Sequence, residues 1–180
     1  MAGLVPGIHV FAAGVYKGVD ARHKAWHDAE RAAVAASPMQ IALDEARAAA
    51  VRGEVPVGAV IVRAGDILAR AGNRTLELRD PTAHAELLAI RAAAAALGSE
   101  RLTGCDLYVT LEPCAMCAAA MSFARIRRLY YGAADPKGGA VDNGVRFFSS
   151  ASCHHRPEVY GGMSESECGA LLKDFFAARR

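Results

Sequence analysis

The chain has no long apolar run, and this limits what it can be. No stretch of its 180 residues approaches the roughly 20 apolar residues that a helix needs to cross a bilayer. The apolar start from Met1 to Tyr16 is interrupted by Pro6 and has no basic residue before Lys17, unlike a secretory signal. We therefore expect no membrane span, no secretory signal and no membrane partner.

A large excess of charge of one sign is also missing. The 21 Lys and Arg residues against 19 Asp and Glu residues leave a net charge of only +2. Because this charge is too small to indicate a nucleic-acid partner by itself, any RNA-binding surface has to be a local patch. A content of 53% hydrophobic and 22% charged residues is typical of one globular domain.

The cysteines do not form the pattern of a disulfide framework. They are odd in number, and two of them stand three positions apart: Cys105, Cys114, Cys117, Cys153 and Cys168. This pattern favours reduced thiols that bind a metal, and a cytoplasmic location. We interpret the three cysteines outside the Cys114/Cys117 pair as ordinary packed thiols.

The chain divides near Met39. Residues 1–38 show no sustained periodicity and end at the turn signal Ser37-Pro38. From Met39, apolar residues recur at helical spacing until Gly53. We interpret 1–38 as an N-terminal extension that either is not native, because the coding start lies too far upstream, or is a flexible, disordered arm. The folded domain is predicted over 39–180.

The domain alternates predicted strands and helices. In chain order we predict, after the helix from Met39, a hairpin over 57–62 and 67–71, a helix over 83–97, a strand over 107–111, a helix over 114–124, a strand over 128–131, an irregular stretch and a last helix from about Ser164. Two strand–helix–strand passes imply a mixed α/β sheet covered by helices.

Two short motifs carry the chemistry. His84-Ala85-Glu86 and, from Pro113, Pro-Cys-Ala-Met-Cys together form the H-x-E and P-C-x-x-C signature of zinc-dependent nucleobase deaminases. Cys114 and Cys117 are i and i+3 on one helix, so their sulfurs face the same way near its N-terminus, which favours thiolates. His84 completes three ligands. The fourth tetrahedral position of Zn²⁺ then remains for water, as in a catalytic site.

Glu86 is predicted to be the proton shuttle. Zinc lowers the pKa of a bound water from 15.7 to roughly 7, so that a nearby base can deprotonate it at neutral pH. We expect Glu86 to take this proton, the hydroxide to attack the amidine carbon of a base, and Glu86 to return protons to the ring nitrogen and the departing ammonia.

Longer stretches around these motifs add a family resemblance. They are 53–60, 73–74, 80–86, 108–114, 135–139 and 175–180. They resemble the bacterial tRNA-specific adenosine deaminases of the cytidine deaminase-like superfamily, over about Met39 to Arg180. The resemblance implies a three-layer α/β/α fold with a central five-stranded mixed sheet, one zinc ion per subunit, a homodimer, and deamination of adenosine to inosine at the wobble position of the tRNA anticodon stem-loop.

The resemblance also implies roles for single residues. Asn73 would hydrogen-bond the flipped-out base, and Val57 and Leu111 would form apolar walls of its pocket. The remaining positions would contact loop nucleotides and phosphates: Asp135, Lys137, Phe176 and Arg180. Asn73 could instead be a turn residue, and Phe176 could instead pack in the core with the apolar face of the last helix.

Other functions stay open at this point. Residues 140–148 depart from the segment common in the family, which leaves substrate detail open. The zinc motif is also shared with deaminases of free bases or nucleosides, of guanine or cytosine type. A non-catalytic zinc-stabilised RNA-binding or dimerisation module and a thiol redox protein that uses Cys114 and Cys117 are further alternatives. The helix over 114–124 could form a dimer face or cover the sheet.

Overall fold

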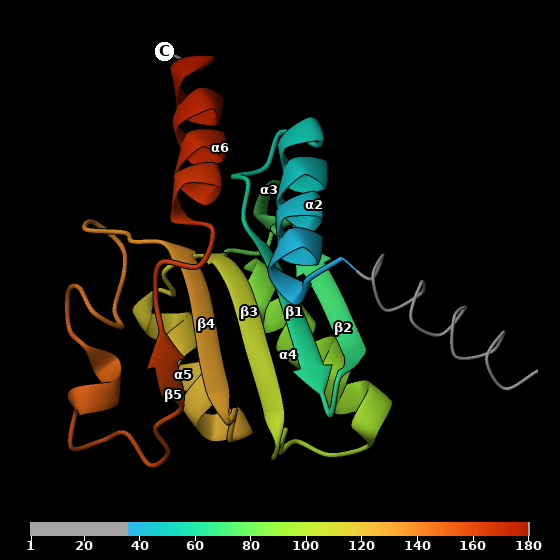
Figure 1. Ribbon diagram of the computed structural model, residues 1–180, viewed down its shortest axis with the longest axis vertical. Coiled ribbons are helices and arrows are strands. Elements are labelled where there is room, and N and C mark those ends of the chain that lie inside the picture. The colour runs from blue at the N-terminus through green and yellow to red at the C-terminus, as the bar shows by residue number, and fades with distance from the viewer. Residues whose placement is uncertain (1–35, 180) are drawn as a thin grey trace, which may run out of the picture. The chain divides into compact units, whose positions relative to one another are not determined.

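One five-stranded mixed sheet organises the computed structural model, which describes residues 36–179 (Figure 1). The strand order is β2-β1-β3-β4-β5, and the strands are β1 (Gly58–Arg63), β2 (Asp66–Gly72), β3 (Cys105–Leu111), β4 (Arg128–Ala133) and β5 (Glu158–Tyr160). β1 is antiparallel to β2 and to β3, whereas β3, β4 and β5 run parallel. The predicted hairpin and the mixed sheet are confirmed.

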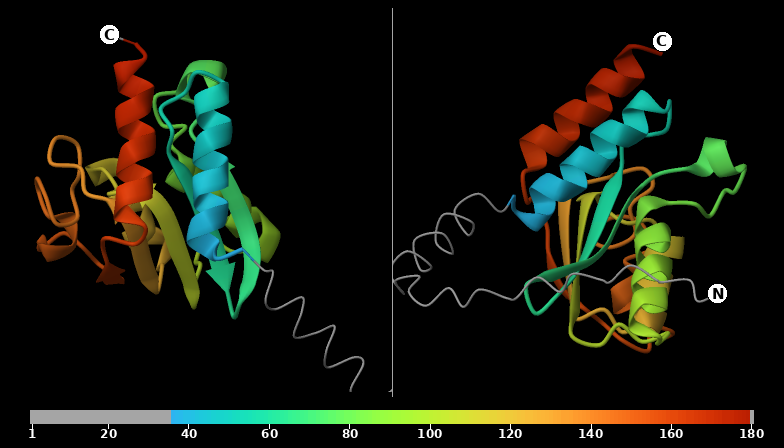
Figure 2. Two further views of the ribbon diagram at one scale, coloured as in Figure 1. Left: turned by 45° about the horizontal axis from the view of Figure 1, so that its top comes forward. Right: turned by 90° about the vertical axis from the view of Figure 1, so that its right-hand side faces the viewer.

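Helices cover both faces of the sheet, which confirms the three-layer fold (Figure 2). On one face lie α2 (Pro38–Val51) and α6 (Glu165–Ala177). On the other lie α4 (Ala85–Leu97) and α5 (Ala115–Ala124). Two short helical turns, α3 (Thr75–Leu78) and the 3₁₀ helix η1 (Phe147–Ser149), complete the elements. No helix in the described range is long and apolar enough to span a bilayer.

Glycine allows α2 to approach the sheet closely. Gly58 of β1 pairs with Gly72 of β2. A Cβ atom at Gly58 would lie 2.0 Å from the carbonyl oxygen of Ala42, and one at Gly72 would lie 2.6 Å from that of Glu45. The backbone of α2 therefore rests directly on β1 and β2, and this close contact fixes the hairpin relative to α2.

The topology brings two helix starts to one edge of the sheet. β2 and β3 point the same way because both are antiparallel to β1. α4 follows β2 through α3, and α5 follows β3, so both helices begin at the same edge. His84 is the N-cap residue of α4 and Cys114 that of α5. The two predicted motifs therefore meet at helix N-termini.

Some elements differ from the sequence-based expectation. α4 begins at Ala85 and α5 at Ala115, one or two residues later than expected, because His84 and Cys114 have extended backbones. The stretch expected to be irregular contains η1 and β5. Ser37 caps α2, its hydroxyl accepting a bond from the Gln40 N–H. The expectation for residues 1–35 lies outside the described residues.

Candidate active site

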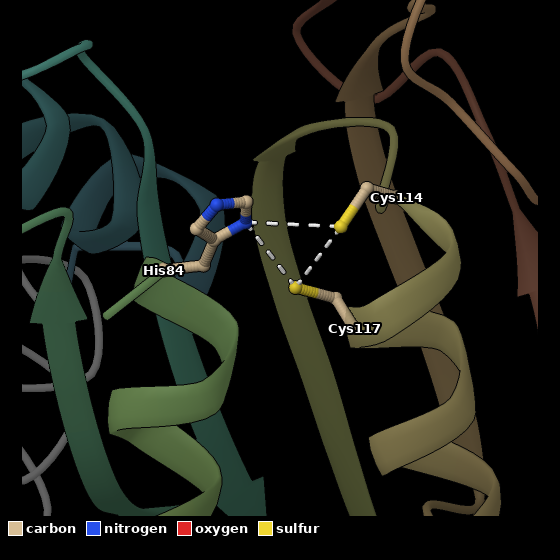
Figure 3. A group of neighbouring side chains, drawn as sticks. All are labelled: His84, Cys114 and Cys117. Atoms are coloured by element: carbon tan, nitrogen blue, oxygen red, sulfur yellow. Dashed lines mark hydrogen bonds between the residues drawn. The ribbon is translucent and has the colours of Figure 1, made fainter. Parts of the chain in front are cut away.

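Three side chains meet between the starts of α4 and α5 (Figure 3). The Nδ1 atom of His84 lies 3.8 Å from Sγ of Cys114 and 3.6 Å from Sγ of Cys117, and the two sulfurs are 3.7 Å apart. All three atoms point to a common centre. They are the one potential metal-binding cluster of His, Cys, Asp and Glu side chains in residues 36–179.

This triangle has the dimensions of one face of a zinc tetrahedron. With Zn–S bonds of 2.3 Å and Zn–N bonds of 2.0–2.1 Å, tetrahedral edges are about 3.8 Å between sulfurs and about 3.6 Å between sulfur and nitrogen. The three distances in the protein agree with these edges to within about 0.2 Å. The residues therefore fit Zn²⁺ without rearrangement, and they leave one ligand position free.

A hydrogen bond joins the two thiols. The hydrogen bond between the sulfurs lowers the pKa of Cys114 to about 4 and, together with burial, raises that of Cys117. The hydrogen bond with Cys114 also raises the pKa of His84. Zinc requires both sulfurs as thiolates and the imidazole as neutral, so its binding releases protons.

Glu86 lies on the first turn of α4, two residues after His84. Its side chain is only 4% exposed, and burial raises its pKa above the ordinary range of a carboxyl group. A raised pKa means that the carboxylate takes up a proton more readily than an ordinary one, which suits a group that has to accept a proton and return it. Its position beside the ligands suits it to a reaction at the free zinc position.

A cavity of about 280 Å³ opens onto this cluster. Of the predicted site residues, it is lined by Val57, Asn73, His84, Glu86, Leu111, Cys114 and Asp135. Val57 and Leu111 form apolar walls, and Val55, which the sequence-based prediction did not include, adds another. Cys117 is fully buried behind the cavity. The geometry therefore joins most of the predicted residues around one space.

Asn73 has one free end. It directly follows β2, and its Oδ1 accepts a 2.8 Å hydrogen bond from the Ala85 N–H at the start of α4. Its Nδ2 has no hydrogen-bond partner among the described residues, although Asn73 is only 7% exposed and lines the cavity. The side chain thus ties the hairpin to α4 and keeps a donor for a ligand.

The predicted RNA contacts lie beside this cavity. Lys137 lines an adjoining cavity of about 620 Å³ together with Asp135, Phe176 and Arg179. Phe176 is 48% exposed, so packing in the core does not account for it. Arg180 lies outside the described residues. Of the remaining cysteines, Cys105 and Cys168 are buried and Cys153 is half-buried, without belonging to the cluster.

Two buried carboxylates near the cavity were not predicted. Glu54 is 1% exposed and accepts bonds from the Thr75 hydroxyl and from the N–H groups of Leu76 and Glu77, so it holds α3. Glu112, which is 2% exposed, accepts several bonds from the loop after β4. The signal available in the sequence was an acidic residue in an otherwise apolar stretch, next to a motif.

Comparisons with known proteins agree with this geometry. Residues 29–133 match the family model described as the cytidine and deoxycytidylate deaminase zinc-binding region. A tRNA-specific adenosine deaminase of Agrobacterium fabrum is 66% identical over 142 residues, which are 79% of this chain and 93% of the relative. The tRNA-specific adenosine deaminase of Bacillus subtilis is 45% identical over 142 residues, which are 79% of this chain and 88% of the relative.

Solved structures are similar as well. One, from a study of A-to-I editing by tRNA:A34 deaminases at the wobble position, has a TM-score of 0.74 and 67% identity and covers 75% of this chain and 98% of its own. A guanine deaminase of Nitrosomonas europaea has a TM-score of 0.69 at 25% identity, and the match covers 80% of this chain and 86% of the guanine deaminase. The higher identity lies with the deaminases that act on tRNA.

Proposed function

Because the chain belongs to the family of tRNA-specific adenosine deaminases, we propose that it converts adenosine to inosine at the wobble position of the tRNA anticodon by hydrolysis in the cavity at the zinc ligands. The observation that carries this proposal is the cavity itself, which joins the Glu86 carboxyl and the Asn73 amide to two of the three ligands. This arrangement combines a base-binding group, a proton shuttle and two metal ligands in one space.

Glu86 performs the proton transfers. His84, Cys114 and Cys117 would hold the zinc ion, which when bound would supply the nucleophile by lowering the pKa of a water to roughly 7. Glu86 accepts a proton as the water oxygen attacks C6 of adenine, and it delivers protons to N1 and to the departing amino group. Water and adenosine thus become inosine and ammonia.

The cavity walls orient the base. Asn73 donates from Nδ2 to an acceptor of the purine, since its Oδ1 is occupied by the Ala85 N–H. Val57 and Leu111 contact the faces of the ring. Because a base inside an RNA helix could not reach this depth, the adenosine has to be flipped out of the anticodon loop.

The tRNA anticodon stem-loop extends over the adjoining cavity. Lys137 and Arg179 are exposed there and can neutralise phosphates, and Phe176 offers an exposed ring for stacking a neighbouring base. Asp135 and Arg180 complete the proposed contacts. These residues form a local patch, which suits a chain whose net charge is only +2.

A homodimer is part of the proposal. The face of α5 that is turned from the sheet carries an apolar stripe at i, i+3, i+4 and i+7: Met116, Ala119, Ala120 and Phe123. Phe123 is 68% exposed, whereas Met116, Ala119 and Ala120 are partly buried. An apolar stripe that ends in an exposed aromatic ring favours a second copy. The opposite face of α5 packs against the sheet. The helix therefore has one face that covers the sheet and another that can form the dimer interface.

Location and domain boundaries complete the proposal. A tRNA substrate and zinc thiolates that must stay reduced support a cytoplasmic enzyme. Residues 39–180 supply every group used above, and we assign no catalytic role to residues 1–38.

A panel of substrates tests this function. The zinc-loaded full chain is incubated with an anticodon stem-loop that carries adenosine at the wobble position and, separately, with free adenosine, guanine and cytosine. We expect inosine in the RNA and no turnover of the free compounds, measured by mass spectrometry. Turnover of a free base alone would assign the chain to the nucleobase deaminases. A lack of all turnover with zinc bound would favour a binding module.

A further inference from the structure

One buried carboxylate organises the loop over the cavity. Glu112 is 2% exposed and stands between β3 and the ligand Cys114. Its Oε1 accepts three backbone bonds of 2.9–3.1 Å from Val141, Asp142 and Asn143. Its Oε2 accepts bonds of 3.0 Å from the Asp135 N–H and 2.6 Å from Asn143 Nδ2. All of these donors belong to the loop of residues 135–143.

We propose that Glu112 is a positioning residue, whose carboxylate pins both ends of the loop of residues 135–143 and thereby sets the affinity of the site for RNA. This inference rests on the proposed function. The loop contributes Asp135 and Gly138 to the catalytic cavity and Lys137 to the adjoining one. Glu112 also lines the catalytic cavity, but both of its carboxylate oxygens are bound to loop donors, so it acts on the substrate through these loop residues.

The bonds of Asp135 extend this control to Lys137. The Asp135 N–H is held by Glu112, and the Asp135 Oδ1 accepts 3.0 Å bonds from the N–H groups of Lys137 and Gly138. The turn that presents Lys137 is therefore fixed by a chain of hydrogen bonds that begins at Glu112. Without Glu112, the Asp135 N–H would lose its acceptor.

Close packing supports the same role. A Cβ atom at Gly139 would lie 2.5 Å from the carboxyl carbon of Glu112 and 2.5 Å from the carbonyl oxygen of Asp135. The loop thus passes the carboxylate at a distance that only glycine permits. The segment of residues 140–148, where this chain departs from the pattern common in its family, supplies four of the five donors to Glu112. Of these four donors, three are backbone N–H groups and one is the side-chain amide of Asn143.

Glu112→Gln is the most direct test, because it preserves shape and removes one acceptor. The amide oxygen can keep the three bonds from Val141–Asn143, and the Asn143 amide can rotate to accept from the new NH₂ group. The Asp135 N–H cannot rotate, so it is left facing a donor. We expect the KM for the stem-loop to rise at least about fivefold, with kcat within about twofold and zinc content unchanged.

Hydrogen exchange measures the loop itself. The Asp135 amide is expected to exchange at least about tenfold faster in Glu112→Gln than in the wild-type chain, while the amides of Val141 to Asn143 stay protected. Because this readout needs no substrate, it reports on Glu112 even if the wild-type chain makes no inosine, an outcome that would instead refute the proposed function.

Two further variants keep the test decisive. Gly139→Ala should raise the KM in the same way, by displacing the carboxylate without any change of charge, and it decides the matter if Glu112→Gln does not fold. The matched control is Glu100→Gln, because the Glu100 side chain is 83% exposed. It should change neither the KM for the stem-loop nor the exchange rate of the Asp135 amide. An unchanged KM in both Glu112→Gln and Gly139→Ala would overturn the proposal. So would a Glu112→Gln variant that loses zinc, or that loses kcat with KM unchanged.

Discussion

Two side chains at this site, those of Asn73 and Glu112, use their different polar atoms for different partners. Asn73 uses Oδ1 to hold α4 through the Ala85 N–H and keeps Nδ2 at the cavity. Glu112 binds residues 141–143 through Oε1, and its Oε2 joins the two ends of the loop by accepting bonds from the Asp135 N–H and from Asn143 Nδ2. A substitution that alters one end alone can therefore separate the structural role of such a residue from its functional one.

Asn73→Asp is such a substitution. The new carboxylate can still accept the bond from the Ala85 N–H, but it replaces the donor at the cavity by an acceptor. We expect kcat/KM for the stem-loop to fall at least about 100-fold, since loss of one oriented donor in a reacting site has this size. Zinc content and thermal stability of the variant should stay near those of the wild-type chain. An activity within tenfold of wild type would assign base recognition to another residue.

Among single residues, the zinc ligands could be predicted from the sequence, whereas the buried carboxylates that hold the segments around the cavity could not. His84, Cys114 and Cys117 were predicted because zinc ligands require particular residue types at particular spacings. Glu54 and Glu112 bind backbone N–H groups of segments that lie at least 20 residues away along the chain. No local pattern encodes such partners, since any segment can offer a backbone N–H.

Among the elements, glycines decide how closely helices approach strands. Gly58→Ala would place a methyl group against the backbone of α2 at 2.0 Å, whereas Gly169 of α6 has open space around it. We expect Gly58→Ala to lower the free energy of unfolding by about 1–3 kcal/mol through overpacking. Gly169→Ala should raise it by about 0.5–1 kcal/mol, because alanine loses less backbone entropy in a helix. Urea denaturation of the two zinc-loaded variants measures both values, and the same sign in both would contradict the packing argument.

Long elements could be predicted from the sequence, and short ones could not. The hairpin and the helices carry their own periodicity, so their existence and order were predicted correctly. β5 has three residues and depends on β4, through the 2.9 Å ion pair of Arg128 with Glu158 and the stacking of Tyr130 on Tyr160. Such a strand exists only once its neighbour is in place.

The last helix shows a second limit of periodicity. Apolar residues recur at helical spacing from Cys168 to Phe176, but only Cys168 and Phe175 of α6 are buried. α6 extends past the edge of the sheet (Figure 1), so its end has no strand to cover. Phe175 is instead covered by the guanidinium of Arg179, 3.5 Å from the ring centroid, which leaves Phe176 exposed beside the cavity.

For the whole molecule, the apolar stripe on α5 predicts the state of assembly. Phe123→Glu places a charge in the proposed interface, where a second copy would bury it without a partner. We expect sedimentation to give a dimer for the wild-type chain and a monomer for the variant. Zinc content should be unchanged, because Phe123 is exposed in the last turn of α5, whereas Cys114 and Cys117 lie at its start. A wild-type monomer, or a variant that stays dimeric, would contradict this interface.

Glu86→Gln tests the central claim most directly. The zinc-loaded full chain and this variant are compared on the wobble-adenosine stem-loop, with inosine measured by mass spectrometry and zinc by elemental analysis. The account predicts equal zinc content and a loss of inosine formation of at least about 100-fold, because the amide cannot carry the proton. Inosine formation within tenfold of the wild-type rate, with zinc bound, would show that Glu86 is not the proton shuttle.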